Sequence, residues 1–264
     1  GPVVAVGDDV EGVRVGDVVG WVAGSEGSYV ERARVLAEQV VPVPDGVPAE
    51  TAAALLLQGI TAHYLVRSTF VVRPGHDVLV HAGAGGVGLL LTQLAVAAGA
   101  RVITTVSTDA KEALSRAAGA ADVVRYDRMA DLGRELPAVV SDLTGGHGVH
   151  VVYDGVGAAT FDGSLASLRR RGTLVLFGGA SGPVPPFDPM RLEAEGSLYL
   201  TRPTIRHYTA DRDELLWRAR ELFDAVLAGR LDVRVGARYP LAEAAEAHRA
   251  LEGRATTGKV LVVP

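Results

Sequence analysis

The fold is decided by one stretch of the 264-residue chain, residues 77–88, which reads Asp77-Val78-Leu79-Val80-His81-Ala82-Gly83-Ala84-Gly85-Gly86-Val87-Gly88. Its first half is typical of a buried strand, and its second half matches the pattern G-x-G-x-x-G at the start of a helix. Glycines at such a junction let the backbone approach a pyrophosphate, which the helix N-terminus attracts through its N–H groups and its dipole. Chance matches are common in a chain with 32 glycines, so the strand-to-helix context carries the prediction of dinucleotide binding.

Apolar segments alternate with amphipathic segments after this stretch. Strands are expected at Asp77–His81, Arg101–Val106, Asp122–Arg125, Val149–Tyr153, Thr173–Phe177 and Ser197–Leu200. Helices are expected at Gly86–Ala98, Ala110–Ala118, Met129–Leu143 and Thr160–Arg170. Apolar strands that alternate with helices are typical of a parallel sheet covered on both faces, so the sequence predicts an α/β fold.

The two ends of the chain have a different character. Short strands are expected early, at Val3–Val6, Val18–Val22, Tyr29–Val35 and Gln39–Val43, and late, at Val233–Tyr239 and Lys259–Val263. Helices are expected at Glu50–Gln58, Thr61–Val71, Asp211–Ala228 and Leu241–Leu251, with the first two joined at Gly59. The early β region is too small to close by itself. Either the late strands complete it, or part of it is absent.

Composition excludes several classes of function. The net charge of -5 and the isoelectric point near 5.8 give no basic footprint, so nucleic acid is not the expected partner. No apolar run reaches the roughly 18–20 residues of a membrane helix, and no secretory signal is visible at the start. The chain has no cysteine, so disulfides, thiolate nucleophiles and cysteine-based zinc sites are excluded. We therefore expect a cytoplasmic protein.

The end of the second expected strand indicates which dinucleotide binds. An NAD site usually carries Asp or Glu at this point, where it binds the ribose 2′-hydroxyl. Here the strand ends in Ser107-Thr108, and Lys111 follows. Hydroxyls and a cation suit a 2′-phosphate, so NADPH is favoured, although Asp109 lies slightly beyond the usual position. Alternatively, Ser107 and Thr108 only cap the next helix.

The order of motifs resembles one family, the zeta-crystallin-like quinone oxidoreductases of the medium-chain dehydrogenase/reductase superfamily. The likeness extends over essentially the whole chain. Besides the glycine loop, the matching stretches are Val15–Val19, Leu57–Tyr64, Val151–Gly157, Phe177–Gly179, Ser197–Pro203 and Arg254–Lys259. The stretch Ser197-Leu198-Tyr199-Leu200-Thr201-Arg202-Pro203 is the most particular to quinone oxidoreductases.

The resemblance implies a two-domain architecture. Residues 60–204 would form a Rossmann NADPH-binding domain, a doubly wound parallel sheet. Residues 1–59 and 205–264 would form a GroES-like, β-rich catalytic domain into which the Rossmann domain is inserted. The family has a leading part of the catalytic domain before Gly1, so the chain is expected to be N-terminally incomplete. A homodimer is also expected, through strands near Leu198.

The resemblance assigns a set of residues to the cofactor. They are Tyr64, Gly86, Val87, Ser107, Lys111, Tyr126, Val156, Phe177, Gly178, Pro203, Thr204 and Arg254. The glycine-loop pair would hold the pyrophosphate, and the four residues Ser107, Lys111, Tyr126 and Arg254 would surround the 2′-phosphate. Tyr64 would lie near the nicotinamide ribose. Val156, Phe177 and Gly178 would sit at the carboxyl ends of the fourth and fifth strands, where ligands bind in such sheets. Pro203 and Thr204 would flank the nicotinamide.

Several of these residues also have simpler interpretations. Val156 and Phe177 suit a hydrophobic core, and Arg254 suits a solvated surface. Lys111 has acidic neighbours on its own helix with which it would pair. Asp154 ends a strand, and we expect it to accept hydrogen bonds from nearby backbone N–H groups rather than to act in catalysis.

A zinc site is not expected. Zinc-dependent relatives carry a cysteine lobe where this chain has the short turn Ser25-Glu26-Gly27-Ser28, and a cysteine ligand where it has Gln58. The seven histidines contain no H-x-x-x-H pair, and no G-x-S-x-G elbow occurs.

Together these features predict an NADPH-dependent quinone reductase that acts on a quinone or related electrophile. Hydride transfer of this kind needs little protein chemistry beyond geometry and exclusion of water, so no catalytic residue is assigned. One alternative is an enoyl or alkenal reductase on the same scaffold. Another is a non-enzymatic, crystallin-like NADPH-binding protein.

Overall fold

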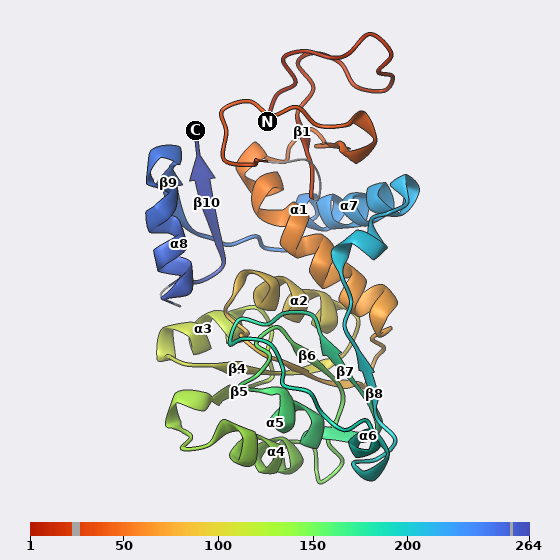
Figure 1. Cartoon of the computed structure of the whole chain (residues 1–264), viewed down its shortest axis with the longest axis vertical. Helices are drawn as coiled ribbons and strands as arrows, with labels where there is room; N and C mark the ends of the chain where they lie inside the picture. The colour runs from red at the N-terminus through yellow and green to blue at the C-terminus, as the bar shows by residue number, and fades with distance from the viewer. Residues whose placement is uncertain (23–26, 254–255) are drawn as a thin grey trace. The chain divides into compact units, whose positions relative to one another are not determined.

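A computed structural model describes the whole chain except residues 23–26 and 254–255 (Figure 1). The described residues form two compact units. Unit 1 combines Gly1–Thr61 with Ile205–Pro264, and unit 2 is the continuous segment Ala62–Thr204. Unit 1 therefore draws on both ends of the chain.

Unit 2 is built on a parallel sheet whose strand order is β5-β4-β3-β6-β7-β8 (Figure 1). The six strands are β3 (Asp77–Val80), β4 (Arg101–Val106), β5 (Asp122–Arg125), β6 (Val149–Asp154), β7 (Leu168–Leu176) and β8 (Tyr199–Thr201). Every neighbouring pair is parallel. The predicted α/β fold with a doubly wound parallel sheet is confirmed. The strand order reverses between β3 and β6, which is where ligands bind in sheets of this kind.

Helices cover both faces of this sheet (Figure 1). The four main ones are α2 (Gly86–Ala97), α3 (Asp109–Ala117), α4 (Leu132–Leu143) and α5 (Phe161–Ala166), and α6 (Met190–Ala194) is a short addition. Figure 1 shows α2 and α3 on one face, and α4 with α5 on the other. Side chains such as Ile103, Leu136 and Leu174 are fully buried between these layers. Each such side chain stabilises the fold by roughly 1.5–3 kcal/mol.

The first long helix differs from the prediction. The sequence predicts two helices joined at Gly59, but α1 (Ala49–Tyr64) runs through this glycine without a break. A Cβ atom at Gly59 would lie 2.7 Å from Leu55 Cδ1 and 3.2 Å from Leu222 Cδ1. The glycine therefore provides space for close packing of α1 and α7 (Arg212–Leu227), and it does not mark a helix end.

A π-helical turn follows α1 at Leu65–Thr69, labelled η2. The buried Tyr153 on β6 donates its hydroxyl to the carbonyl oxygens of Leu65, at 2.9 Å, and Phe70, at 3.3 Å. Burial raises the pKa of the Tyr153 hydroxyl well above its ordinary value, so it stays protonated and donates. This contact connects the turn to the centre of the sheet.

Unit 1 contains two small sheets. One pairs β1 (Val19–Gly20) with β2 (Val41–Pro42) in antiparallel fashion, and the other pairs β9 (Val235–Pro240) with β10 (Lys259–Val263) in parallel. The remaining elements are η1 (Ala37–Gln39), η4 (Ile205–Tyr208), α7 (Arg212–Leu227), η5 (Leu241–Glu243) and α8 (Ala244–Glu252).

Contacts join the early and late parts of unit 1. Arg212 donates to the carbonyl oxygens of Ala37 and Val40, at 3.0 and 3.3 Å. Arg238 on β9 forms an ion pair of 2.6 Å with Glu50 on α1. The segments brought together here lie about 170 to 190 positions apart in sequence.

Two of the expected early strands are wrong. Val3–Val6 and Tyr29–Val35 are not strands, and β1 and β2 are shorter than the runs from which they were predicted. A strand needs a hydrogen-bonding neighbour and a face to bury. Val4 is 63% exposed and Tyr29 is 53% exposed, so neither run has found a core in the described part of the chain.

Two helices of unit 2 begin or end away from the expected residues. α4 starts at Leu132, because Asp131 caps it by accepting from the N–H of Arg134 and a 3-10 turn, η3 (Tyr126–Arg128), precedes it. α5 ends at Ala166, because β7 already begins at Leu168. None of the described helices is both long and apolar enough to cross a membrane.

Candidate cofactor site

The glycine loop follows β3 and packs closely against β4 and the start of α2. The backbone of Ala82 has φ of 53°, so the left-handed residue of the loop is an alanine and not one of the motif glycines. A Cβ at Gly83 would lie 2.6 Å from Thr104 Cβ, and one at Gly88 would lie 2.2 Å from the carbonyl oxygen of Ala82. These two glycines are therefore required by close packing of the loop on β4 and of α2 on the end of β3.

The start of α2 is suited to bind an anion. Gly85 is its N-cap, and no side chain in the described part of the chain caps this helix. The first residues of α2 are Gly86 and Val87, which are predicted for the pyrophosphate. Uncapped N–H groups and the positive end of the helix dipole favour a negatively charged ligand here.

The residues predicted for the 2′-phosphate meet at the end of β4. Lys111 Nζ donates to Ser107 Oγ at 3.4 Å. Thr108 caps α3 by accepting from the backbone N–H of Lys111 at 3.2 Å, so the capping interpretation holds for Thr108. The Ser107 hydroxyl bonds the Lys111 ammonium group. A hydroxyl and a cation therefore lie together at the point where an NADH site has a carboxylate.

Tyr126 lies on the next strand end, where it begins η3 and is half-buried. Its neighbour Arg125, which the sequence analysis missed, donates to the carbonyl oxygen of Ser107 at 3.5 Å. Arg125 also pairs with Asp109, the first residue of α3. The ends of β4 and β5 are thus connected through this arginine. A basic residue at the end of the third predicted strand was the only signal for it.

The loop after β6 is held by a buried carboxylate. Asp154 is 0% exposed, and its Oδ1 accepts from the backbone N–H groups of Val156, at 2.8 Å, and Gly157, at 3.0 Å. The expectation that Asp154 bonds backbone N–H groups is confirmed. Its role is to fix the conformation of the loop that presents Val156.

The same carboxylate ends a buried hydrogen-bond network. Asp154 Oδ2 accepts from Thr160 Oγ1 at 2.7 Å and from Ser164 Oγ at 2.8 Å. Ser164 Oγ lies 2.9 Å from His81 Nε2, and His81 Nδ1 lies 3.0 Å from Thr105 Oγ1. Burial lowers the pKa of His81, so its imidazole is neutral at pH 7. The network links the ends of β3, β4 and β6 beneath the glycine loop.

The end of β7 packs closely against the loop after β6. The backbone N–H groups of Phe177 and Gly178 donate to the carbonyl oxygen of Asp154, at 2.9 and 3.3 Å. A Cβ at Gly178 would lie 2.4 Å from the carbonyl oxygen of Gly155, and one at Gly155 would lie 2.9 Å from the Phe177 ring. Phe177 and Gly178 are therefore brought together with the Val156 loop, at the carboxyl ends of neighbouring strands.

The remaining predicted residues lie at the edges of unit 2. Tyr64 ends α1 and is buried. Pro203 is buried and Thr204 is exposed, in the segment after β8 that Arg202 attaches to the end of β7 by donating to the carbonyl oxygen of Leu176 at 3.0 Å. Arg254 lies outside the described residues.

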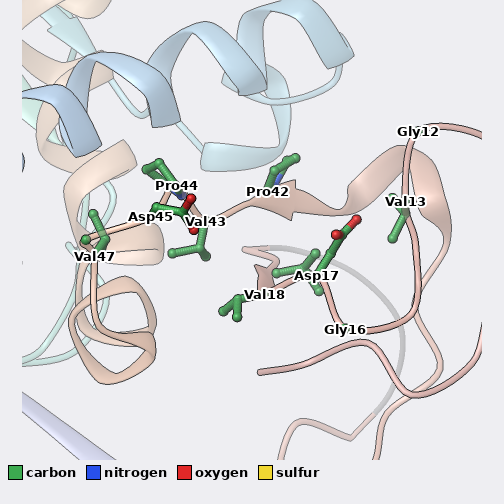
Figure 2. Close-up of a pocket in the computed structure, with 12 residues that line it drawn as sticks. Gly12, Val13, Gly16, Asp17, Val18, Pro42, Val43, Pro44, Asp45 and Val47 are labelled. Atoms are coloured by element: carbon green, nitrogen blue, oxygen red, sulfur yellow. The ribbon is translucent and has the colours of Figure 1, made fainter.

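A cavity of about 390 Å³ lies elsewhere, in unit 1 (Figure 2). Figure 2 shows it lined mainly by valine and proline side chains, together with the carboxylates of Asp17 and Asp45. It contains none of the residues predicted for the cofactor, and its carboxylates would repel a phosphate. In the described part of the chain, no three His, Asp or Glu side chains gather as metal ligands would.

Comparison with known proteins gives the family. A sequence profile described as zinc-binding dehydrogenase matches residues 86–215. A quinone oxidoreductase of Salmonella typhimurium is 42% identical over 266 residues, which cover 100% of this chain and 80% of that protein. The 2-haloacrylate reductase of a Burkholderia species is 38% identical, over 98% of this chain and 77% of that relative.

A solved structure agrees with these sequence relatives. A mycobacterial protein in complex with NADPH is 54% identical and superposes with a TM-score of 0.94, over 100% of this chain and 80% of that one. Identity above 40% along the entire chain, together with the same fold, shows that this protein belongs to the quinone oxidoreductase family.

Proposed function

We propose that this protein is an NADPH-dependent oxidoreductase that reduces a quinone or a related electrophile. The observation that carries the proposal is the pair formed by Ser107 and Lys111 at the end of β4, with Nζ and Oγ 3.4 Å apart. A Rossmann sheet that binds NADH presents a carboxylate at this point, and a cation with a hydroxyl favours a 2′-phosphate instead.

The residues of unit 2 fit this cofactor. Gly86 and Val87 would bind the pyrophosphate at the start of α2, and Tyr126 would complete the phosphate site beside Ser107 and Lys111. Val156, Phe177, Gly178, Pro203 and Thr204 would line the nicotinamide end, with Tyr64 near its ribose. The family resemblance assigns Arg254 to the 2′-phosphate as well, but this residue lies outside the described residues. When bound, NADPH supplies a hydride.

The protein's part in the reaction is to position the cofactor and the acceptor and to exclude water. Asp154 and its network keep the loop of Val156 in place, so the nicotinamide end meets a preformed surface. We propose that unit 1 is the GroES-like catalytic domain. No nucleophile is needed, because the cofactor performs the difficult step.

The acceptor has two candidate classes. The quinone oxidoreductase of Salmonella supports a quinone, and the Burkholderia 2-haloacrylate reductase supports an activated C=C bond, since its named substrate is a conjugated alkene. Of the two, the quinone is favoured by the higher identity. A non-enzymatic NADPH-binding role predicts tight binding without turnover.

The test is a titration followed by turnover. NADPH and NADH are titrated against the full chain, and the bound cofactor is then exposed to 1,4-benzoquinone and to an enone. Preferential NADPH binding with quinone-dependent oxidation is the expected result. Faster oxidation by the enone would favour the alkene reductase, and tight binding without oxidation would favour the non-enzymatic role.

We also propose that the protein works in the cytoplasm as a homodimer. The absence of cysteine suits a reducing compartment. β8 is an edge strand of the sheet and carries Tyr199, which is 62% exposed, so pairing of two such edges would cover it. Sedimentation velocity of the wild type and of Tyr199→Arg tests this, and a monomeric wild type would contradict it.

A further inference from the structure

Asp109 stands beside the pair that we assign to the 2′-phosphate. It is the first residue of α3, two positions after Ser107, and its side chain is 86% exposed. A carboxylate at this point repels a 2′-phosphate and would accept a hydrogen bond from the ribose hydroxyl of NADH. Something in the structure must therefore offset its charge if NADPH is to be preferred.

Two arginines lie on the carboxylate of Asp109. Arg125, at the end of β5, donates to Asp109 Oδ1. Arg128, at the end of η3, donates to the same oxygen at 3.1 Å. Two arginines thus contact the Asp109 carboxylate, and both come from the segment that also carries Tyr126.

Arg125 is held more firmly than a surface arginine. Its side chain is only 10% exposed, and it forms a bidentate pair with Asp127, with both distances 2.9 Å. Hydrogen bonds to Asp127 and then to Asp109 raise the pKa of Arg125 above its already high value, so its charge is permanent. It lies 3.6 Å from Glu112 and also donates to the carbonyl oxygen of Ser107.

We propose that Arg125 is a positioning residue that determines the choice of cofactor. With Arg128, it pairs with Asp109 and keeps that carboxylate turned toward β5. Ser107 and Lys111 are then presented to the 2′-phosphate without a competing negative charge. This inference rests on the proposed function, because it concerns the same NADPH site.

A double-mutant cycle tests the inference. The full-length wild type, Arg125→Gln, Asp109→Asn and the double variant are titrated with NADPH and with NADH, and cofactor fluorescence reports binding. NADH is the internal control, since it lacks only the 2′-phosphate. Arg125→Gln is expected to weaken NADPH binding about tenfold and NADH binding less than about threefold, because the released carboxylate repels only the phosphate.

The double variant gives the decisive result. If Arg125 acts by masking Asp109, removal of the carboxylate restores NADPH binding to within about threefold of the wild type. Arg116→Gln is the matched control: it removes the same charge from α3, where Arg116 pairs with Glu112, and is expected to change the NADPH to NADH ratio less than about twofold.

Two outcomes overturn the inference. Equal losses of NADPH and NADH in Arg125→Gln would make the residue a structural support, and an unrepaired double variant would exclude masking of Asp109. Failure of the proposed function has a different signature, because the wild type itself would then bind NADH as tightly as NADPH. A wild type that prefers NADPH, with no repair in the double variant, refutes the inference alone.

Discussion

Removal of the Asp154 carboxylate is expected to destabilise unit 2 and to loosen the nicotinamide end of the site. Asp154 is fully buried and accepts four hydrogen bonds, two from backbone N–H groups and two from hydroxyls. In Asp154→Ala the Thr160 hydroxyl has another acceptor, because it already lies 3.1 Å from the carbonyl oxygen of Gly157, and the Ser164 hydroxyl gains one when the His81 imidazole changes its tautomer so that Nε2 accepts.

The loss of stability therefore comes from the two N–H groups of Val156 and Gly157, which lose their acceptor. A buried donor without a partner costs about 1–3 kcal/mol, so Asp154→Ala should lower the free energy of unfolding by about 2–6 kcal/mol. This is a large part of the roughly 5–15 kcal/mol that stabilises an ordinary domain. NADPH binding should weaken as well, since the loop of Val156 loses its support.

Asp154→Asn is the matched control. Its amide oxygen still accepts from both N–H groups, and its nitrogen faces two hydroxyls that can rotate to accept a hydrogen bond. We expect a loss of about 1 kcal/mol with near-normal cofactor binding.

The assay is urea unfolding of the three proteins, followed by NADPH titration. If Asp154→Ala costs less than about 1 kcal/mol, water has replaced the carboxylate and the loop is held by other contacts. Equal losses for the alanine and asparagine variants would likewise contradict this expectation, because asparagine keeps the oxygen that accepts from the two N–H groups.

Three further outcomes are expected. Gly88→Ala should destabilise the fold by roughly 1–3 kcal/mol and weaken NADPH binding at least about tenfold, because the new Cβ would lie 2.2 Å from the rigid carbonyl oxygen of Ala82. Unchanged NADPH binding in a titration would contradict this. Lys111→Ala should weaken NADPH binding about tenfold and spare NADH, and equal effects on the two Kd values would remove the 2′-phosphate assignment. Burial lowers the pKa of His81, so this histidine binds a proton more readily in the unfolded chain than in the folded one. The stability of the fold is therefore retained above about pH 6.5 and lost as the pH falls below that value. Urea midpoints at about pH 7.5 and 5.5 measure this loss, which should be smaller in His81→Asn.

Much of unit 2 could be predicted from the sequence, because its strands and its glycine motif depend on short-range patterns. Five of its six strands are short apolar runs predicted close to their observed positions. The exception is β7, which begins at Leu168, within the predicted helix, because its first residues, Leu168–Arg171, are largely charged. The glycine pattern at residues 83–88 was predicted at the strand-to-helix junction where it lies. Patterns of this kind depend on neighbours within a few residues, so they can be read without knowledge of the rest of the fold.

The ends of the chain were harder to predict. Val3–Val6 has the composition of a strand, but in the described residues only Val3 bonds a neighbouring segment, at Gly16 and Asp17, and a strand needs a partner along its length. Gly59 looked like a helix break, yet its role is to admit Leu222 from a helix far along the chain. Neither outcome is encoded in the local pattern.

The site divides in the same way. The glycine loop at the strand-to-helix junction, the proximity of Ser107 and Lys111, and the bonding of Asp154 to backbone N–H groups could be predicted from the sequence, because these residues lie within a few positions of what they contact. The contact of His81 with Ser164 and that of Arg125 with Asp109 follow from the three-dimensional fold alone. The physical reason is that a parallel sheet brings together strand ends separated by whole helices, and the strand order determines which side chains become neighbours.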